Sequence, residues 1–138
     1  MVSVDRPESV IKVAVADGRE QFRKAIKALL STFSDIEVIA EADSESEAIA
    51  VTERYHPEVV LIGDLIPILA GFKTVAHIKN CWPEVSVIVI TVHEELMSAA
   101  KVVGADSFLV KGGNPDTLVS TIRNVSHAPP QKRISLGG

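Results

Sequence analysis

The sequence predicts an α/β fold, (βα)5 and doubly wound, in which five helices cover a five-stranded parallel sheet. Short apolar runs of strand character alternate with segments whose apolar residues recur every three or four positions. That alternation indicates a parallel sheet with helices on both faces. With 138 residues, of which 46% are hydrophobic, the chain is long enough for one domain with a sizeable core.

The elements follow one another in regular order. We expect strands at 10–16, 36–40, 59–62, 85–91 and 107–110, and helical faces within 22–33, 48–55, 72–78, 96–103 and 115–125. Ser44 and Glu47 form a capping box for the second helix. Gly104 is the expected C-cap of the fourth helix, and Asn114 with Pro115 opens the fifth. We expect a flexible N-terminus at 1–9, one domain at 10–126 and a flexible tail at 127–138, with no output domain in this chain.

The bulk composition narrows the classes of function. A net charge of −4 and a pI near 5.5 give no electrostatic reason to bind nucleic acid or an anionic membrane. Cys81 is the only cysteine, and the first residues lack the apolar core of a signal peptide. A cytoplasmic location is therefore the expectation.

Polar residues follow three of the apolar runs at the point where each predicted strand ends. Asp17 follows the first, Thr91 ends the fourth and Lys111 follows the fifth, whereas Gly63 follows the third. Ligands of doubly wound sheets bind beyond the carboxyl ends of the strands, so we expect these positions to form the site. Structure alone would also explain Asp17 as a helix cap.

The order Asp, acceptor Asp, Thr and Lys at successive strand ends resembles the receiver domain of bacterial response regulators. The stretches 36–42 and 104–111 are similar to the NarL/FixJ-type receivers that precede helix-turn-helix output domains. The resemblance implies a flavodoxin-like (CheY-like) fold and a role in two-component, phosphorelay signal transduction. In that family a phosphoryl group is transferred to the acceptor aspartate.

The resemblance also assigns positions one by one. Pro67 and Gly71, four and eight residues on, place Gly63 at the acceptor position. Thr91 matches the residue that follows the incoming phosphoryl group, and Lys111 matches the family's lysine. Phe108, which could equally be a core residue, matches the aromatic switch.

Two departures, Gly63 at the acceptor position and Gly18 in the acidic pair, remove most of the chemistry that the family uses. The acidic pair that helps to bind Mg²⁺ is here Asp17 and Gly18, and Val92 stands where a small residue is usual. Phosphoryl transfer needs a nucleophilic oxygen and a cation, and Mg²⁺ prefers carboxylate oxygens. We therefore expect weak or absent Mg²⁺ binding, no other cofactor, no enzymatic activity and a receiver that works without phosphorylation.

Three structural expectations follow from the loss of the acceptor. Lys111 should pair with Asp17 and hold the site in one state. Asp64 should point away from the pocket, because successive side chains of a strand alternate between its faces. The fold should accept aspartate at Gly63.

Two alternatives stay open. One is a working receiver that is phosphorylated on Asp64 through a local register shift. The other is a small-molecule or nucleotide binder on the same flavodoxin-like architecture, although no glycine-rich nucleotide motif is present. For the favoured interpretation, the resemblance implies contacts through the fourth helix, fifth strand and fifth helix. The expected partners are a histidine kinase, another regulator, an output domain or a second copy, with no nucleic acid and no membrane.

Overall fold

The computed structural model describes residues 10–65 and 69–126, and the segments 1–9 and 127–138 that were expected to be flexible lie outside these ranges. One parallel sheet has the strand order β2-β1-β3-β4-β5. Its strands are β1 (Ile11–Ala16), β2 (Ile36–Ala42), β3 (Val59–Ile62), β4 (Ser86–Thr91) and β5 (Ser107–Val110). The helices are α1 (Glu20–Leu30), α2 (Glu45–Tyr55), α3 (Leu69–Cys81), η3 (Glu94–Leu96, a 3-10 turn), α4 (Met97–Val102) and α5 (Pro115–Ser126). The predicted fold class is confirmed.

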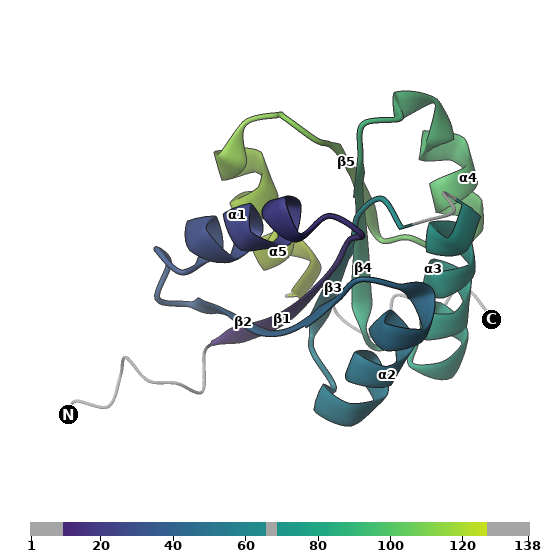
Figure 1. Ribbon diagram of the computed structural model, residues 1–138, viewed down its shortest axis with the longest axis horizontal. Coiled ribbons are helices and arrows are strands. Elements are labelled where there is room, and N and C mark those ends of the chain that lie inside the picture. Colours follow the sequence, from purple (N-terminus) through teal and green to yellow (C-terminus); the bar gives the residue numbers. More distant parts are fainter. Residues whose placement is uncertain (1–9, 66–68, 127–138) are drawn as a thin grey trace.

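The helices form two layers around the sheet, as Figure 1 shows: α1 and α5 lie on one face, and α2, α3 and α4 lie on the other. The strand register aligns the carboxyl ends of neighbouring strands. Ala16 at the end of β1 pairs with Ile62 at the end of β3, and Thr91 at the end of β4 pairs with Val110 at the end of β5. The residues that follow these strands therefore meet at one edge of the sheet, where the sequence predicted the site.

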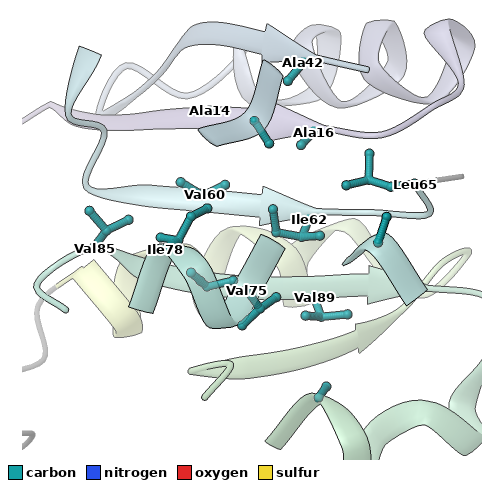
Figure 2. Close-up of a cluster of buried hydrophobic side chains, with 14 residues drawn as sticks. Ala14, Ala16, Ala42, Val60, Ile62, Leu65, Val75, Ile78, Val85 and Val89 are labelled. Atoms are coloured by element: carbon teal, nitrogen blue, oxygen red, sulfur yellow. The ribbon is translucent and has the colours of Figure 1, made fainter. Parts of the chain in front are cut away.

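Two hydrophobic clusters hold the layers together, one on each face of the sheet. Alternate side chains of β1 serve both, since Ala14 and Ala16 belong to the cluster under α2, α3 and α4, while Val13 and Val15 belong to the cluster under α1 and α5. Figure 2 shows the first cluster, in which Val75 and Ile78 of α3 lie against the strands. Each fully buried aliphatic side chain contributes about 1.5–3 kcal/mol, so this burial is the main source of stability.

Local signals in the sequence explain most helix ends. The Ser44 hydroxyl accepts a hydrogen bond from the backbone N–H of Glu47 at 3.3 Å, which is one half of the predicted capping box. In the other half, the Glu47 carboxylate accepts from the backbone N–H of Asp43, one residue before the expected donor Ser44. Asn114 caps α5 by accepting from the N–H of Asp116 at 2.8 Å. Gly104 follows α4 with a φ of 103°, as its predicted capping role requires. No helix in the described part of the chain is long and apolar enough to cross a membrane.

Candidate functional site

Four polar side chains meet at the carboxyl ends of β1, β3, β4 and β5. We call Asp17, Asp64, Thr91 and Lys111 the carboxylate cluster. The Lys111 ammonium lies between the two acids, 2.8 Å from Oδ2 of Asp17 and 3.0 Å from Oδ2 of Asp64. Thr91 donates its hydroxyl to Oδ1 of Asp64 at 2.5 Å. One lysine therefore joins residues from two separate loops, those after β1 and β3.

Asp17 is fully buried and satisfied on both carboxylate oxygens. Oδ1 accepts the backbone N–H of Arg19 at 2.7 Å, which shapes the turn into α1. Oδ2 accepts the backbone N–H of Asp64 and the Lys111 ammonium, both at 2.8 Å. The expected pairing of Lys111 with Asp17 is confirmed. Asp17 shapes the turn before α1 and contacts Lys111, but it is not the helix cap, because Arg19 is the N-cap residue and no described side chain caps α1.

Asp64 points into the cluster, so the prediction that it points away is wrong. Its side chain is only 14% exposed and contacts both Thr91 and Lys111. The prediction extended strand alternation one residue too far, because β3 ends at Ile62 and Asp64 lies in the loop that follows. Outside a strand the alternation rule does not apply, and the loop turns the carboxylate back toward Lys111.

Gly63 leaves room for this arrangement. Its backbone N–H still bonds to Ala16 at 2.7 Å, so it continues the ladder beyond β3. A Cβ atom at Gly63 would lie in the space taken by Oδ2 of Asp17, closer than any van der Waals contact permits. The position therefore faces the pocket, as an acceptor position should. The expectation that the fold accepts aspartate there needs correction, because Asp17 would first have to move.

The cluster carries surplus negative charge. Two carboxylates share one ammonium group, and Oδ2 of Asp64 is buried without a hydrogen bond of good geometry to any described residue. Burial raises the pKa of Asp64, but the hydrogen bond from Thr91 and the contact with Lys111 outweigh it and hold the pKa below its ordinary value. Asp64 is therefore charged at neutral pH.

The donors present do not fit a Mg²⁺ site like that of the family. Gly18 supplies no second acid, and both remaining carboxylates contact the Lys111 ammonium, which a metal ion would have to displace. Within 10–65 and 69–126, no group of three or more His, Cys, Asp or Glu side chains could hold a metal ion. Nδ1 of His93, the residue before η3, lies 3.5 Å from Oε2 of Glu95.

The remaining residues assigned by resemblance lie around the cluster. Phe108 is half-buried and packs against the core cluster under α4, as a core residue would. Val92 is exposed next to Thr91. Pro67, which carried part of the spacing argument, lies outside the described residues.

Two neighbours of the cluster were missed from the sequence. Arg23 donates to the backbone carbonyl of Asp17 at 2.8 Å and to Glu41 at 3.0 Å. The ring of Phe22 lies under the Lys111 ammonium, 4.1 Å from ring centroid to Nζ. Both residues sit on α1, and only the folded position of that helix against β1 and β2 brings them to the site. Their sequence spacing alone carried no such signal.

Comparison with known proteins gives the same architecture. VraR, a response regulator protein of Staphylococcus aureus, is 31% identical over 118 residues, which cover 84% of this chain and 56% of VraR. DegU, a transcriptional regulatory protein of Brevibacillus brevis, is 26% identical over 121 residues, which cover 86% of this chain and 51% of DegU. The chain thus spans about half the length of these curated relatives.

Solved structures agree at the level of the fold. The signal receiver domain of NarL from Mycobacterium tuberculosis superimposes with a TM-score of 0.81 at 23% identity, covering 88% of this chain and 99% of that one. The response regulator domain of Thermotoga maritima CheB gives a TM-score of 0.80 at 23% identity, with the same coverage. The family model for the response regulator receiver domain matches residues 13–123. The chain therefore belongs to the response regulator receiver domain family of two-component systems.

Proposed function

We propose that this receiver domain signals through protein contacts without being phosphorylated. One observation carries the proposal: Lys111 and Thr91 are already engaged by the Asp64 carboxylate, with Asp17 on the other side of Lys111. In the family, the residue that Thr91 matches follows the incoming phosphoryl group. Here a fixed negative group of the protein holds both Thr91 and Lys111, so the cluster has the contacts of a switched site at all times.

The space around Asp64 supports this proposal. Beside Asp64 and Thr91 the structure leaves a cavity of about 20 Å³, which holds roughly one water molecule. Phosphoryl transfer requires the donor to approach in line with the attacking oxygen. Oδ1 is bonded to Thr91, and Oδ2 faces the ammonium group. Both oxygens are therefore obstructed.

Charge neutralisation is the second requirement of the reaction. A metal ion or cationic side chain must offset the charge that develops on the transferred group. Gly18 removes one acid of the metal site, and Asp17 is held by two backbone N–H groups and Lys111. The cation that contacts Asp64 is the Lys111 ammonium, and its charge is already shared by the carboxylates of Asp17 and Asp64. As a signalling module, the chain needs no catalytic activity of its own.

The second candidate function is a receiver that is phosphorylated on Asp64. The position of this carboxylate favours it, because Asp64 lies within reach of Thr91 and Lys111, the two residues that match the family's pocket. The candidate requires the cluster to open and Oδ1 to leave Thr91 before the donor arrives.

We assign the partner surface to α4, β5 and α5. Exposed apolar side chains gather on the first two elements: Val102 is 86% exposed, Met97 41% and Val110 38%. Exposed apolar groups of this size favour protein contacts. A histidine kinase, another regulator, an output domain or a second copy of the chain would each fit a surface of this kind.

Intact-mass spectrometry after incubation with acetyl phosphate and Mg²⁺ separates the two candidates. We expect no phosphoryl adduct on the wild type. An adduct on the wild type that is absent from Asp64→Asn would establish the second candidate and overturn our proposal.

A repaired site gives the matched control. Gly63→Asp with Gly18→Asp restores an acceptor and the second acid, and the carboxylate introduced by Gly63→Asp displaces Asp17 from the space that it now fills. The double variant should label far better than either single variant, because both residues serve one metal-bound site. A folded double variant that never labels would show that the fold, and not the two glycines, prevents the reaction.

A further inference from the structure

A cavity of about 450 Å³ lies on the opposite side of Lys111 from the small space at Asp64, between α1, α5 and the sheet. Figure 1 shows α1 and α5 on the same face, with the loop from β5 to α5 arching beyond the strand ends. Four elements and this loop supply the walls: Phe22, Ile26 and Leu29 from α1, Ile90 from β4, Leu109 from β5, and Leu118 from α5. The cavity is separate from the carboxylate cluster but shares Lys111 with it.

The size and lining of the cavity are those of a small-molecule site. The cavity is a groove open to solvent and not an interior void, because lining residues such as Ala25, Val110 and Thr117 are exposed. Ligand sites have volumes of about 300–1,000 Å³, with mostly apolar walls and a few polar groups. This cavity lies within that range, and its helix and sheet walls are apolar.

The polar groups lie at one end only, where Lys111, Gly112, Gly113 and Asn114 form the rim. Gly112 has a φ of 87°, and a Cβ built on it would meet nothing within 4 Å, so the backbone of this loop is open to a ligand. Lys111 already serves two carboxylates, so no unbalanced positive charge faces the cavity from this residue. An anionic ligand would meet surplus negative charge behind Lys111.

We propose that this cavity binds a neutral, mainly apolar small molecule, with a ring system against the α1 and α5 walls and one hydroxyl or carbonyl group at the loop 112–114. The bound molecule contacts Phe22, whose ring lies 4.1 Å from the Lys111 ammonium. Occupancy is therefore transmitted to the carboxylate cluster through a single side chain. The binding site does not depend on whether Asp64 is phosphorylated.

The probe is 2-naphthol, a neutral two-ring molecule with one hydroxyl group, added to the full chain and followed by amide NMR. We expect saturable shifts confined to α1, β5, the loop and the start of α5, together with smaller shifts at Asp64 and Thr91. No saturable shift, or shifts spread over both faces of the sheet, would overturn the proposal.

Two cavity-filling variants and one matched control test the location. Ala25→Phe fills the cavity from α1, and Thr117→Phe fills it from α5. Ala28→Phe adds the same ring to an exposed α1 position that does not line the cavity. Each filling variant should weaken 2-naphthol binding at least about tenfold while Ala28→Phe leaves it unchanged. Equal affinity in all three, or a wild-type dimer that Ala25→Phe dissociates, would contradict a small-molecule site.

Discussion

Two lysine–carboxylate clusters lie at opposite ends of the same sheet and are built differently. At the carboxyl ends, Lys111 serves two acids, Asp17 and Asp64. At the amino ends of β4 and β5, Lys79 lies 2.9 Å from one acid among the described residues, Asp106. It also donates to the backbone carbonyls of Val85 and Pro83 at 2.8 and 3.2 Å. Both lysines are largely buried, so the difference lies in the ratio of charges.

The Lys79 cluster, formed by Lys79 and Asp106, stabilises the fold by joining separate elements. Oδ2 of Asp106 accepts the backbone N–H of Val87 at 2.7 Å as well as the Lys79 ammonium, which ties α3 to β4 and to the residue before β5. The Lys111 cluster holds an excess carboxylate, that of Asp64, whose Oδ2 is buried without a well-formed hydrogen bond to a described residue. An unbalanced buried charge is the mark of a functional site, whereas a balanced one is explained by structure alone.

The largest expected effect is that of removing each lysine. Lys111→Met leaves two buried carboxylates without a cation and should lower the free energy of unfolding by about 3–5 kcal/mol. Lys79→Met should cost about 1–2 kcal/mol, because Asp106 keeps the N–H of Val87. Urea unfolding at pH 7 measures both. Adding Asp64→Asn to Lys111→Met should recover part of the loss, and an equal cost for the two lysines would show that charge ratio does not matter.

A smaller effect should separate two glycines near the clusters. Gly63→Ala places a Cβ atom against Oδ2 of Asp17, so the buried acid must move, at a cost of about 1–3 kcal/mol. Gly71→Ala, in α3, meets nothing closer than Ile62 Cγ2 at 3.7 Å and should be neutral or stabilising by up to about 1 kcal/mol. Thermal unfolding of the two variants is the measurement. If Gly63→Ala is as stable as the wild type, Asp17 does not fill the space over Gly63.

The pH dependence of stability should identify Asp64. Its pKa in the folded protein lies below the ordinary value of 3.8, because contacts with Thr91 and Lys111 outweigh the effect of burial. A depressed pKa gives a stabilisation that is present above pH 3.8 and lost as the pH falls through the lower, folded-state pKa. Asp64→Asn should remove this part of the acid-induced loss in the free energy of unfolding. The change should be smaller than those expected for the lysine and glycine variants. Carboxyl-carbon NMR titration should place the midpoint below 3.8, and a higher midpoint would contradict us.

The smallest effect is expected where the same chemistry is exposed to water. Lys24 lies 3.3 Å from Glu20 one helical turn away, with both side chains mostly exposed. Exposed ion pairs contribute about 0–1 kcal/mol and are screened by salt. Lys24→Met should therefore change the free energy of unfolding by no more than about 0.5 kcal/mol. Urea unfolding at low and high salt measures this change. A loss comparable to that of Lys79→Met would mean that burial does not set the order of the three pairs.

The fold and most of the site could be predicted because their signals are local. Asp17, Thr91 and Lys111 each lie at the end of an apolar run, and parallel strands bring such positions to one edge. The orientation of Asp64 could not be predicted in this way, since it depends on where β3 ends and on the space left by Gly63. The cavity had no local signal either. Its volume is set by how α1 rests on β1 and β2 while α5 rests on β3, β4 and β5. Its walls join residues as far apart in the sequence as Phe22 and Lys111.

The position of Asp17 over Gly63 has a consequence for how such a domain changes over generations. Once the residue at 63 lacks a side chain, Asp17 takes the space and makes bonds there that include the N–H of Asp64. A single replacement of Gly63 by aspartate would place its Cβ atom against Oδ2 of Asp17. The second acid of the metal site would still be absent at Gly18. Selection that acts on one substitution at a time would find that first step unfavourable. Under the function proposed above, descendants of this chain are expected to diversify their partner surfaces instead of gaining a phosphorylation switch.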